Sequence, residues 1–511
     1  MKRNYEEKPK LITDVLELAE EMDIPVKFPK NVLAQADAMP DCVSESDMDG
    51  REAFREELTI TIDGPDAKDL DDAVSLTRLS DGYCLKVHIA DVSAYVPESS
   101  ALDREAKKRG TSVYIGNKVV PMLPKRLSNG ICSLNAGEDR LTLSVVMEFD
   151  LAGKIRCHRI VKGLINVNER MTYPDVKAIL ENEDPAIAQK YADLVPMLTD
   201  MKELADKLRK RREMRGGIDF DFPEVKFDFN EEDDPVDAHP EYADCATKLI
   251  EDFMLAANET VAEEFFGKSI PFVYRVHEEP DEEKAENMIA FIRRCGGTIT
   301  KKGKSLTPRE VQQAIRSLSG KPEEAMASQV ILRSMQQARY STKCEGHFGL
   351  AAKYYCHFTS PIRRYPDLQI HRIIHDVLEQ PENEDRKMRH YRDILPDVAL
   401  LSSVTERRAV EAEREGNKLL FCRLMKAKIG QKFFGVVSSV VRWGVYVELP
   451  NMAEGLVHVS KLNEDYFHFN EESGTMVGRL GGKEIRVGDA MEVVVSGVDL
   501  ERRLIDFTPA P

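Results

Sequence analysis

The pattern of apolar and polar positions changes character twice along the chain. Residues 1–57 carry one helix-like apolar face, at Val15, Leu18 and Ala19, and then a loop interrupted by prolines. From Leu58, short alternating runs predict strands over 58–62, 73–77, 83–90, 141–149 and 155–165. Helical periodicity then predicts helices over 185–213, 245–265, 281–295, 308–317, 322–335, 366–378 and 398–426.

Near Gly430 the pattern returns to short strands separated by glycine-rich turns. Five are predicted, over 431–441, 444–449, 455–459, 491–498 and 504–508, which is the number and length of strands in a small closed barrel of the OB type. The predicted fold class is therefore α+β. An N-terminal helical segment (1–57) is followed by a mixed α/β body (58–428) and a C-terminal all-β barrel (429–511).

Composition limits the kinds of partner. Of the 511 residues, 42% are hydrophobic and 32% charged, which is enough to bury a large core. The 72 basic and 89 acidic residues give a net charge of −17, which would repel nucleic acid if it were spread evenly. Any nucleic-acid site therefore needs a segregated basic channel or a metal ion held by carboxylates.

Sorting signals and cysteine spacing indicate a cytoplasmic protein. The chain has no apolar run long enough to span a bilayer and no apolar signal core at its start, so no membrane association is expected. Its nine cysteines are scattered and form no CxxC pair, which fits reduced thiols and argues against a zinc ribbon.

The sharpest motif is a cluster of five aspartates within ten residues, directly after the predicted strand 58–62. They are Asp63, Asp66, Asp69, Asp71 and Asp72. Packed carboxylates repel one another, and a divalent cation removes that cost. Two Mg²⁺ ions held here could stabilise the attacking and leaving oxygens of a phosphoryl displacement. A solvated acidic loop is the alternative interpretation.

A basic and aromatic motif follows much later, over residues 357–367 and 371–372. Arg363, Arg364 and Arg372 could grip phosphate, and Ser360 could add a hydrogen bond. The aromatic residues Phe358 and Tyr365 are interleaved with them, which suits base stacking. Beside a carboxylate–metal cluster, a phosphate clamp is the preferred interpretation over a surface ion pair.

Six sequence blocks, in order, resemble the ribonuclease II/ribonuclease R (RNB) family of hydrolytic 3′→5′ exoribonucleases. They are residues 62–73, 88–93, 127–130, 215–220, 274–278 and 357–365. The last block is more similar to the ribonuclease R branch. Members of the family usually carry two cold-shock domains ahead of the catalytic body, and residues 12–57 instead resemble the linker that follows the second of these.

The resemblance implies a role for each matching position. Asp63, Asp69, Asp71 and Asp72 match the metal-binding and catalytic aspartates, and Arg363 and Arg364 match the arginine region near the scissile phosphate. Tyr114 matches the aromatic residue that clamps the 3′-terminal nucleotide, and Tyr173 matches one that helps set the product length. Glu413, or its neighbour Glu411 on the same helix, matches a glutamate near the active site.

The C-terminal barrel resembles an S1-type RNA-binding domain over residues 434–458. The positions that would offer stacking faces to RNA are Phe434, Trp443, Tyr446 and His458. For Phe434 and Tyr446, the alternative is that the side chain points into the barrel core.

Together these features predict a Mg²⁺-dependent exoribonuclease that degrades single-stranded RNA processively to nucleoside 5′-monophosphates. One alternative is a non-catalytic RNA-binding regulator on the same fold. Another is a nuclease that is active only with RNA-degradation partners that supply further RNA-binding domains. A phosphorolytic enzyme is disfavoured.

Overall fold

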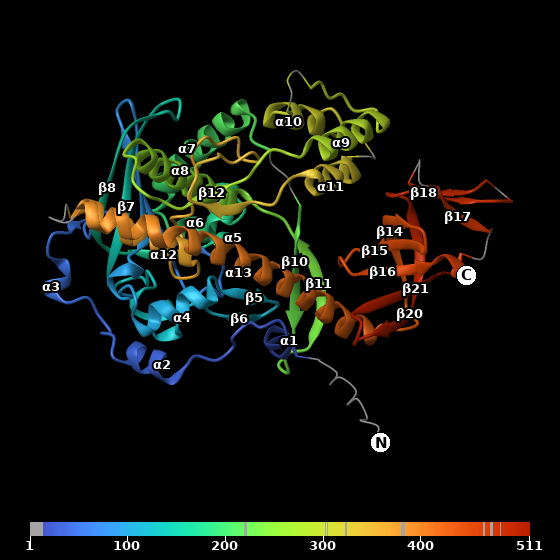
Figure 1. The fold of residues 1–511 in the computed structure, drawn as a ribbon, viewed down its shortest axis with the longest axis horizontal. Helices are drawn as coiled ribbons and strands as arrows, with labels where there is room; N and C mark the ends of the chain where they lie inside the picture. The colour runs from blue at the N-terminus through green and yellow to red at the C-terminus, as the bar shows by residue number, and fades with distance from the viewer. Residues whose placement is uncertain are drawn as a thin grey trace.

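A mixed α/β body fills most of the molecule, and a long helix joins it to a closed five-stranded barrel at one end (Figure 1). The computed structural model describes residues 14–218, 222–301, 303, 305–321, 324–379, 384–462, 466–470, 474–480 and 482–510. This arrangement confirms the predicted fold class. No helix in these ranges is both long and apolar enough to cross a membrane.

The N-terminal segment was predicted as one helix and a loop, but it forms three short helices, α1 (Val15–Glu21), α2 (Lys30–Asp37) and α3 (Glu45–Met48). Their caps explain the difference, since Asp14 accepts the Leu16 and Glu17 N–H groups and Ser44 forms a capping box with Asp47. As expected, the segment lies against the main body, because α1 packs on the long helix and α2 on α4 (Ala101–Arg109).

A seven-stranded sheet forms the centre of the body, in the order β1-β8-β7-β4-β3-β2-β9. The five predicted strands are present as β2 (Ile60–Asp63), β3 (Asp72–Leu79), β4 (Gly82–Ala90), β7 (Asp139–Asp150) and β8 (Ile155–Asn166). The edge strands β1 (Glu52–Ala53) and β9 (Glu169–Thr172) were not predicted, because runs this short show no periodicity. Both edge strands pair in parallel with their neighbours.

The remaining elements of this half of the body are short. They are the turns η1 (Val92–Ala94) and η2 (Leu127–Ile131), the hairpin β5 (Val113–Ile115) and β6 (Lys118–Val120), and the helix α5 (Tyr173–Leu180).

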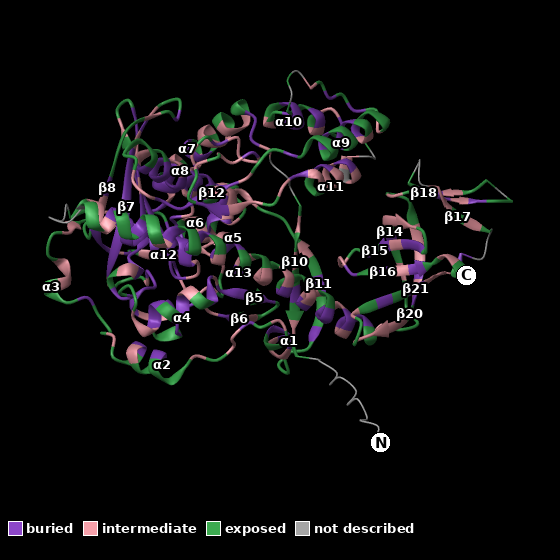
Figure 2. Ribbon diagram, viewed as in Figure 1, coloured by how far each residue is buried: buried purple, intermediate pink, exposed green. Residues whose placement is uncertain are grey.

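The sheet is covered by α7 (Val195–Arg215) and α8 (Cys245–Gly267), which pack on each other and share the largest core cluster with β3, β4 and β7. Figure 2 shows buried residues concentrated in the sheet and in the helices against it. The helix predicted over 185–213 is interrupted: α6 (Pro185–Lys190) ends before a turn in which Tyr191 and Leu194 are buried. α7 then begins at Val195, with Pro196 in its first turn, where a missing N–H costs no helical hydrogen bond.

Two hairpins and three further helices complete the body. The hairpins are β10 (Glu224–Phe229) with β11 (Pro235–Glu241), and β12 (Tyr274–Val276) with β13 (Arg339–Ser341). The helices α9 (Glu282–Arg294), α10 (Pro308–Arg316) and α11 (Glu324–Ser334) share a small core of their own.

The helix α12 (Tyr365–Leu378) follows the arginine motif, and α13 (Glu384–Lys426) leads to the barrel. The prediction placed the start of α13 at 398, but the helix runs through Pro396. Proline usually ends a helix. Here the buried side chains of Tyr391 and Leu395 hold the preceding turns against the core.

The five predicted barrel strands are confirmed as β14 (Lys432–Val441), β15 (Gly444–Glu448), β16 (Glu454–His458), β20 (Ala490–Asp499) and β21 (Leu504–Pro509), and they close into one barrel. After the turn η3 (Val459–Lys461), a three-stranded sheet is added by β17 (Phe467–Asn470), β18 (Thr475–Gly478) and β19 (Glu484–Ile485). The barrel core is continuous with residues of α1 and α13, so the N-terminal helix helps to fix the barrel to the body.

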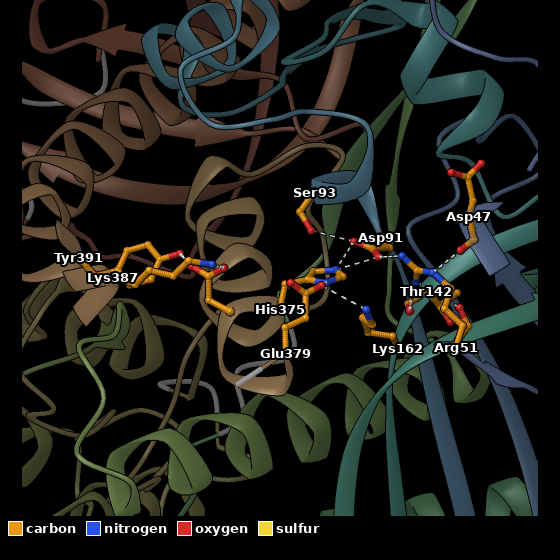
Figure 3. A network of polar contacts seen from close by, with 12 residues as sticks. Asp47, Arg51, Asp91, Ser93, Thr142, Lys162, His375, Glu379, Lys387 and Tyr391 are labelled. Carbon is orange, nitrogen blue, oxygen red and sulfur yellow. Dashed lines mark hydrogen bonds and ion pairs between the residues drawn. The ribbon is translucent and has the colours of Figure 1, made fainter. Parts of the chain in front are cut away.

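A buried ionic network ties the N-terminal segment, the sheet and α12 together (Figure 3). The Asp91 carboxylate, just after β4, accepts hydrogen bonds from Arg51 and Ser93 at 2.7 Å and from His375 at 2.9 Å. Burial alone would raise the pKa of Asp91, but His375 and Arg51 hold it well below its usual range. The network therefore fixes the helix that carries the arginine motif against the sheet.

We expect Asp91→Asn to lower the free energy of unfolding by about 3–5 kcal/mol at neutral pH, since it leaves Arg51 buried without its partner. A carboxyl with a lowered pKa stabilises the fold above its unfolded pKa of about 4 and loses this effect as pH falls. The difference between variant and wild type should therefore shrink below about pH 4. Urea unfolding across this range measures it. Asp81→Asn, in the exposed pair with Arg156, is the control and should cost less than about 1 kcal/mol.

Candidate active site and RNA-binding surfaces

The aspartate cluster occupies the connection between β2 and β3. Asp63 ends β2, and Asp72 begins β3. Between them the Arg170 guanidinium donates to the carbonyl oxygens of Pro65, at 3.0 Å, and Ala67, at 2.6 Å. The Ser133 hydroxyl accepts the Leu70 N–H at 3.1 Å. These contacts fold the loop back on itself, so that carboxylates at both ends face one space.

The arginine motif docks on this loop from a distant part of the chain. The Ile362 N–H donates to Asp71 Oδ1 at 2.9 Å, and Arg363 Nε lies 3.5 Å from Asp71 Oδ2. The Ser112 N–H donates to the Arg363 carbonyl oxygen at 2.9 Å, which fixes the motif from its other side. Residues almost three hundred positions apart thus form one site.

The two motifs line a pocket of about 250 Å³. All four aspartates predicted as metal ligands line it, as do Ser360, Arg363 and Arg364; the remaining lining residues are Tyr173, Ile250, Glu251, Met254, Leu255, Asn258, Tyr355 and Thr359. The structure therefore brings together the acidic and basic residues that the sequence singled out, with an apolar patch of α8 beside them.

Burial and mutual repulsion disfavour the charged forms of the carboxyl groups in the pocket. Burial, and then the neighbouring carboxylates, raises the pKa of Asp63, of Asp71 and of Asp72, and Arg363 offsets part of each shift. Asp63 Oδ2 is buried and accepts no hydrogen bond from the described residues. This is an arrangement that a cation would relieve.

The donor set fits Mg²⁺, which prefers carboxylate oxygens. Within the described ranges, no three His, Cys, Asp or Glu side chains converge into a complete ligand set. The protein would then supply one or two carboxylates directly, and water and substrate phosphate would supply the other oxygens, as is common for Mg²⁺. Asp63 and Asp72 fit this role best, since each is half-buried, their charges repel each other, and Asp71 is already engaged by Ile362 and Arg363.

The two arginines differ in what they contact. Arg364 donates two hydrogen bonds to the fully buried Asp367, at 2.7 and 3.0 Å, and Asp367 also accepts the Ser360 N–H. Arg363 keeps 43% of its side chain exposed, and among the described residues it pairs with Asp71 and donates one side-chain hydrogen bond, to the Ser360 hydroxyl at 3.0 Å. Arg363 is therefore the arginine available to a phosphate, and Arg364 shapes the turn that presents it.

Two predicted tyrosines lie at the edges of the acidic cluster. The Tyr114 hydroxyl, on β5, donates to Asp69 Oδ2 at 3.4 Å, and its ring is 39% exposed. Tyr173, the first residue of α5, lines the pocket, and burial followed by Asp63 and Asp72 raises the pKa of its hydroxyl. Both positions are compatible with contacts to the end of a strand.

Three predicted RNA contacts are wrong, because the side chains are buried. Phe358 is fully buried, with its ring 4.7 Å from that of His371. The Tyr365 hydroxyl donates to Asp103 at 2.9 Å, and Arg372 forms a buried ion pair with the same carboxylate. The basic and aromatic spacing of the motif reflects the packing of α12 rather than a contact surface.

The role of Glu413 near the active site stays a prediction. Glu413 is not among the residues that line this pocket, and Glu224 of β10 adds to burial in raising the pKa of Glu413. Its neighbour Glu411 pairs with Arg414. In the family block over 215–220, Asp219 and Phe220 lie outside the described residues.

Sequence reasoning missed Asn258 of α8, which lines the pocket. Its side chain accepts the Phe358 N–H at 2.7 Å and donates to Thr359 at 3.4 Å, and so fixes the loop segment that leads into the arginine motif. Nothing in the sequence could indicate this residue, because one asparagine in an amphipathic helix carries no local signal.

The barrel presents part of the predicted stacking surface. Phe434 is 72% and Trp443 52% exposed, so Phe434 does not point into the core. His458 is exposed and Tyr446 half-buried. The strand registers place Tyr446 beside Leu456, and His458 two residues along β16, on the outward face of the barrel. An aromatic surface of this kind suits stacking with little base specificity.

Comparison with known proteins matches two domain families to the chain. The RNB domain family matches residues 51–380, and the S1 RNA binding domain family matches residues 426–508. Ribonuclease R 1 of Lactococcus lactis is 45% identical over 98% of this chain, and the chain spans 61% of the length of that relative.

Solved structures of other proteins have a similar fold. Mycoplasma genitalium RNase R, in complex with ribose-methylated single-stranded RNA, superposes with a TM-score of 0.89 at 28% identity, covering 97% of this chain and 77% of that one. The fold also occurs in yeast Ssd1, described as a pseudonuclease, with a TM-score of 0.72 at 20% identity over 90% of this chain and 57% of that one. The chain therefore belongs to the RNB family and is related to its ribonuclease R members.

Proposed function

We propose that this chain is a Mg²⁺-dependent hydrolytic exoribonuclease that shortens single-stranded RNA processively from its 3′ end to nucleoside 5′-monophosphates. The observation that carries the proposal is the pocket in which buried and half-buried, mutually repelling aspartates face one half-exposed arginine. Carboxylates and a guanidinium arranged in this way fit a phosphodiester with an associated cation.

Each residue has a distinct task in this proposal. Asp63 and Asp72 hold Mg²⁺, which supplies the positive charge that activates water and stabilises the leaving oxygen. Asp71 orients Arg363 and the Ile362 N–H, and Arg363 holds the scissile phosphate. Tyr114 stacks on the terminal base, and Tyr173 limits how far the strand advances. We also predict a second ion, with Asp69 among its ligands.

The likeness to a pseudonuclease keeps one alternative in view, a non-catalytic RNA-binding protein on the same fold. The charge of the pocket argues against it, since a binding surface gains nothing from burying repelling carboxylates. A nuclease that needs partners to supply further RNA-binding domains is the other alternative. We propose that the protein acts in the cytoplasm.

The first experiment incubates the purified chain with 5′-labelled single-stranded RNA and Mg²⁺. We expect a ladder that shortens from the 3′ end, and released nucleoside monophosphates that form without added phosphate. EDTA and Asp71→Asn should each abolish the ladder. A gel shift without cleavage would contradict the proposed activity of the isolated chain, and nucleoside diphosphates would indicate phosphorolysis.

Arg363→Ala and Arg364→Ala should fail in different ways. The first removes a phosphate contact and should lower kcat about 10²–10³-fold with little change in stability. The second leaves Asp367 buried without its partner and should cost about 3–5 kcal/mol of unfolding free energy. Single-turnover cleavage and thermal melting measure the two effects. The assignment is wrong if Arg363→Ala loses stability and Arg364→Ala loses only activity.

Trp443 is the only tryptophan of the chain, so its fluorescence reports on the barrel alone. We expect RNA to quench this fluorescence, and Trp443→Ala to weaken RNA binding by about 1–3 kcal/mol. Leu504→Ala, at another exposed apolar position of the barrel, is the control and should bind RNA as the wild type does. Unchanged fluorescence at saturating RNA would exclude the tryptophan as a contact.

A further inference from the structure

Three adjoining cavities lie over β12 and β13, apart from the aspartate pocket. Their volumes are about 780, 560 and 740 Å³. The first and second share Phe266 and Cys344, and the second and third share Thr342 and Pro396. We call this continuous depression the basic trough. Its lining residues include members of α8, α11 and α13, whose positions are labelled in Figure 1.

The trough is separate from the catalytic pocket. No residue lines both, and the wall between them is thin: Tyr354 faces the trough, whereas the adjacent Tyr355 lines the catalytic pocket. The Tyr340 hydroxyl, behind the trough, is hydrogen-bonded to His357 at 2.9 Å, which closes the wall further along. A molecule in the trough is therefore outside the site of hydrolysis.

The charge of the trough is opposite to that of the protein. Eight lysines and arginines and three glutamates line it, in a chain whose net charge is −17. Five of these cations are exposed, and none of the five forms an ion pair with any described residue; they are Arg333, Lys343, Lys353, Arg392 and Arg407. Unpaired cations gathered in one depression favour an extended anion over a single carboxylate.

An aromatic platform lies where the first two cavities meet. Phe266 is 46% exposed, and its ring centre is 4.8 Å from that of Tyr354. Lys353 Nζ lies 4.9 Å from the centre of the Tyr354 ring. Exposed rings beside cations are the combination that binds stacked bases and their phosphates.

We infer that the basic trough binds single-stranded RNA at a part of the molecule distant from its 3′ end. This inference rests on the proposed function, because the trough would hold the body of a strand whose end lies in the catalytic pocket. The exposed Phe266 ring beside the half-buried Tyr354 ring favours RNA over an acidic peptide, which needs cations but no stacking surface. The trough then adds affinity only for strands long enough to reach both sites.

The experiment compares charge-removing variants on two lengths of RNA. Binding is measured in an Asp71→Asn background, with oligonucleotides of about 30 and about 6 nucleotides, the shorter about the size of one small binding site. The variants are Arg333→Gln with Arg407→Gln, and Lys343→Gln with Arg392→Gln. The matched control is Lys210→Gln with Arg211→Gln, two exposed cations on α7 outside the trough.

For the long RNA, we expect each trough variant to weaken binding and to reduce the slope of log Kd against log salt by about one per cation removed. For the short RNA, and for the control variant, Kd should not change. Phe266→Ala should weaken binding of the long RNA with the salt slope intact.

Several outcomes would overturn the inference. They are an unchanged salt slope with the long RNA, an equal loss with the short RNA, or variants that lose only the binding of a polyglutamate peptide. Failure of the proposed function is distinguishable, since it appears as absent cleavage of both RNAs by the wild type, whatever the binding results.

Discussion

The site depends on one constraint: several carboxylates must be buried beside one another without unfolding the loop that carries them. Each of Asp63, Asp71 and Asp72 is held in a place where burial disfavours its charge. The loop tolerates this because Arg170 and Ser133 fix its backbone and because Arg363 supplies a compensating charge. Carboxyl groups with raised pKa values gather at functional sites, where a bound cation and a phosphate would offset their repulsion.

The surrounding fold keeps that arrangement in register. The Ile362 N–H reaches Asp71 only because α12 lies at a fixed place against the sheet, and the Asp91 network holds α12 there. Asp367 then shapes the turn from inside, so that Arg364 is held by Asp367 whereas the Arg363 side chain stays half-exposed. Adjacent arginines with the same chemistry thus acquire different functions from their partners.

Acidic and basic residues are segregated on different surfaces of the molecule. The chain as a whole is strongly acidic, yet the basic trough carries unpaired cations and the barrel presents exposed aromatic rings. An acidic exterior discourages non-specific attachment of polyanions, and local basic surfaces then decide where a strand can lie.

The sequence by itself determined the fold class, the barrel strands and the chemistry of the acidic cluster. These features are local: alternation marks β2, β3 and β4, and five aspartates in ten residues are conspicuous in any context. The short edge strands, the break before α7 and the passage of α13 through Pro396 were missed, because packing outweighs local preference at those places.

Which side chains of the basic motif line the pocket depends on tertiary packing. Phe358, Tyr365 and Arg372 carry the residue types of an RNA contact, but they are buried against His371 and Asp103. Asn258 carries no local signal and yet positions the motif. Spacing along a chain gives the chemistry available to a segment, whereas the direction of each side chain depends on partners that lie hundreds of residues away.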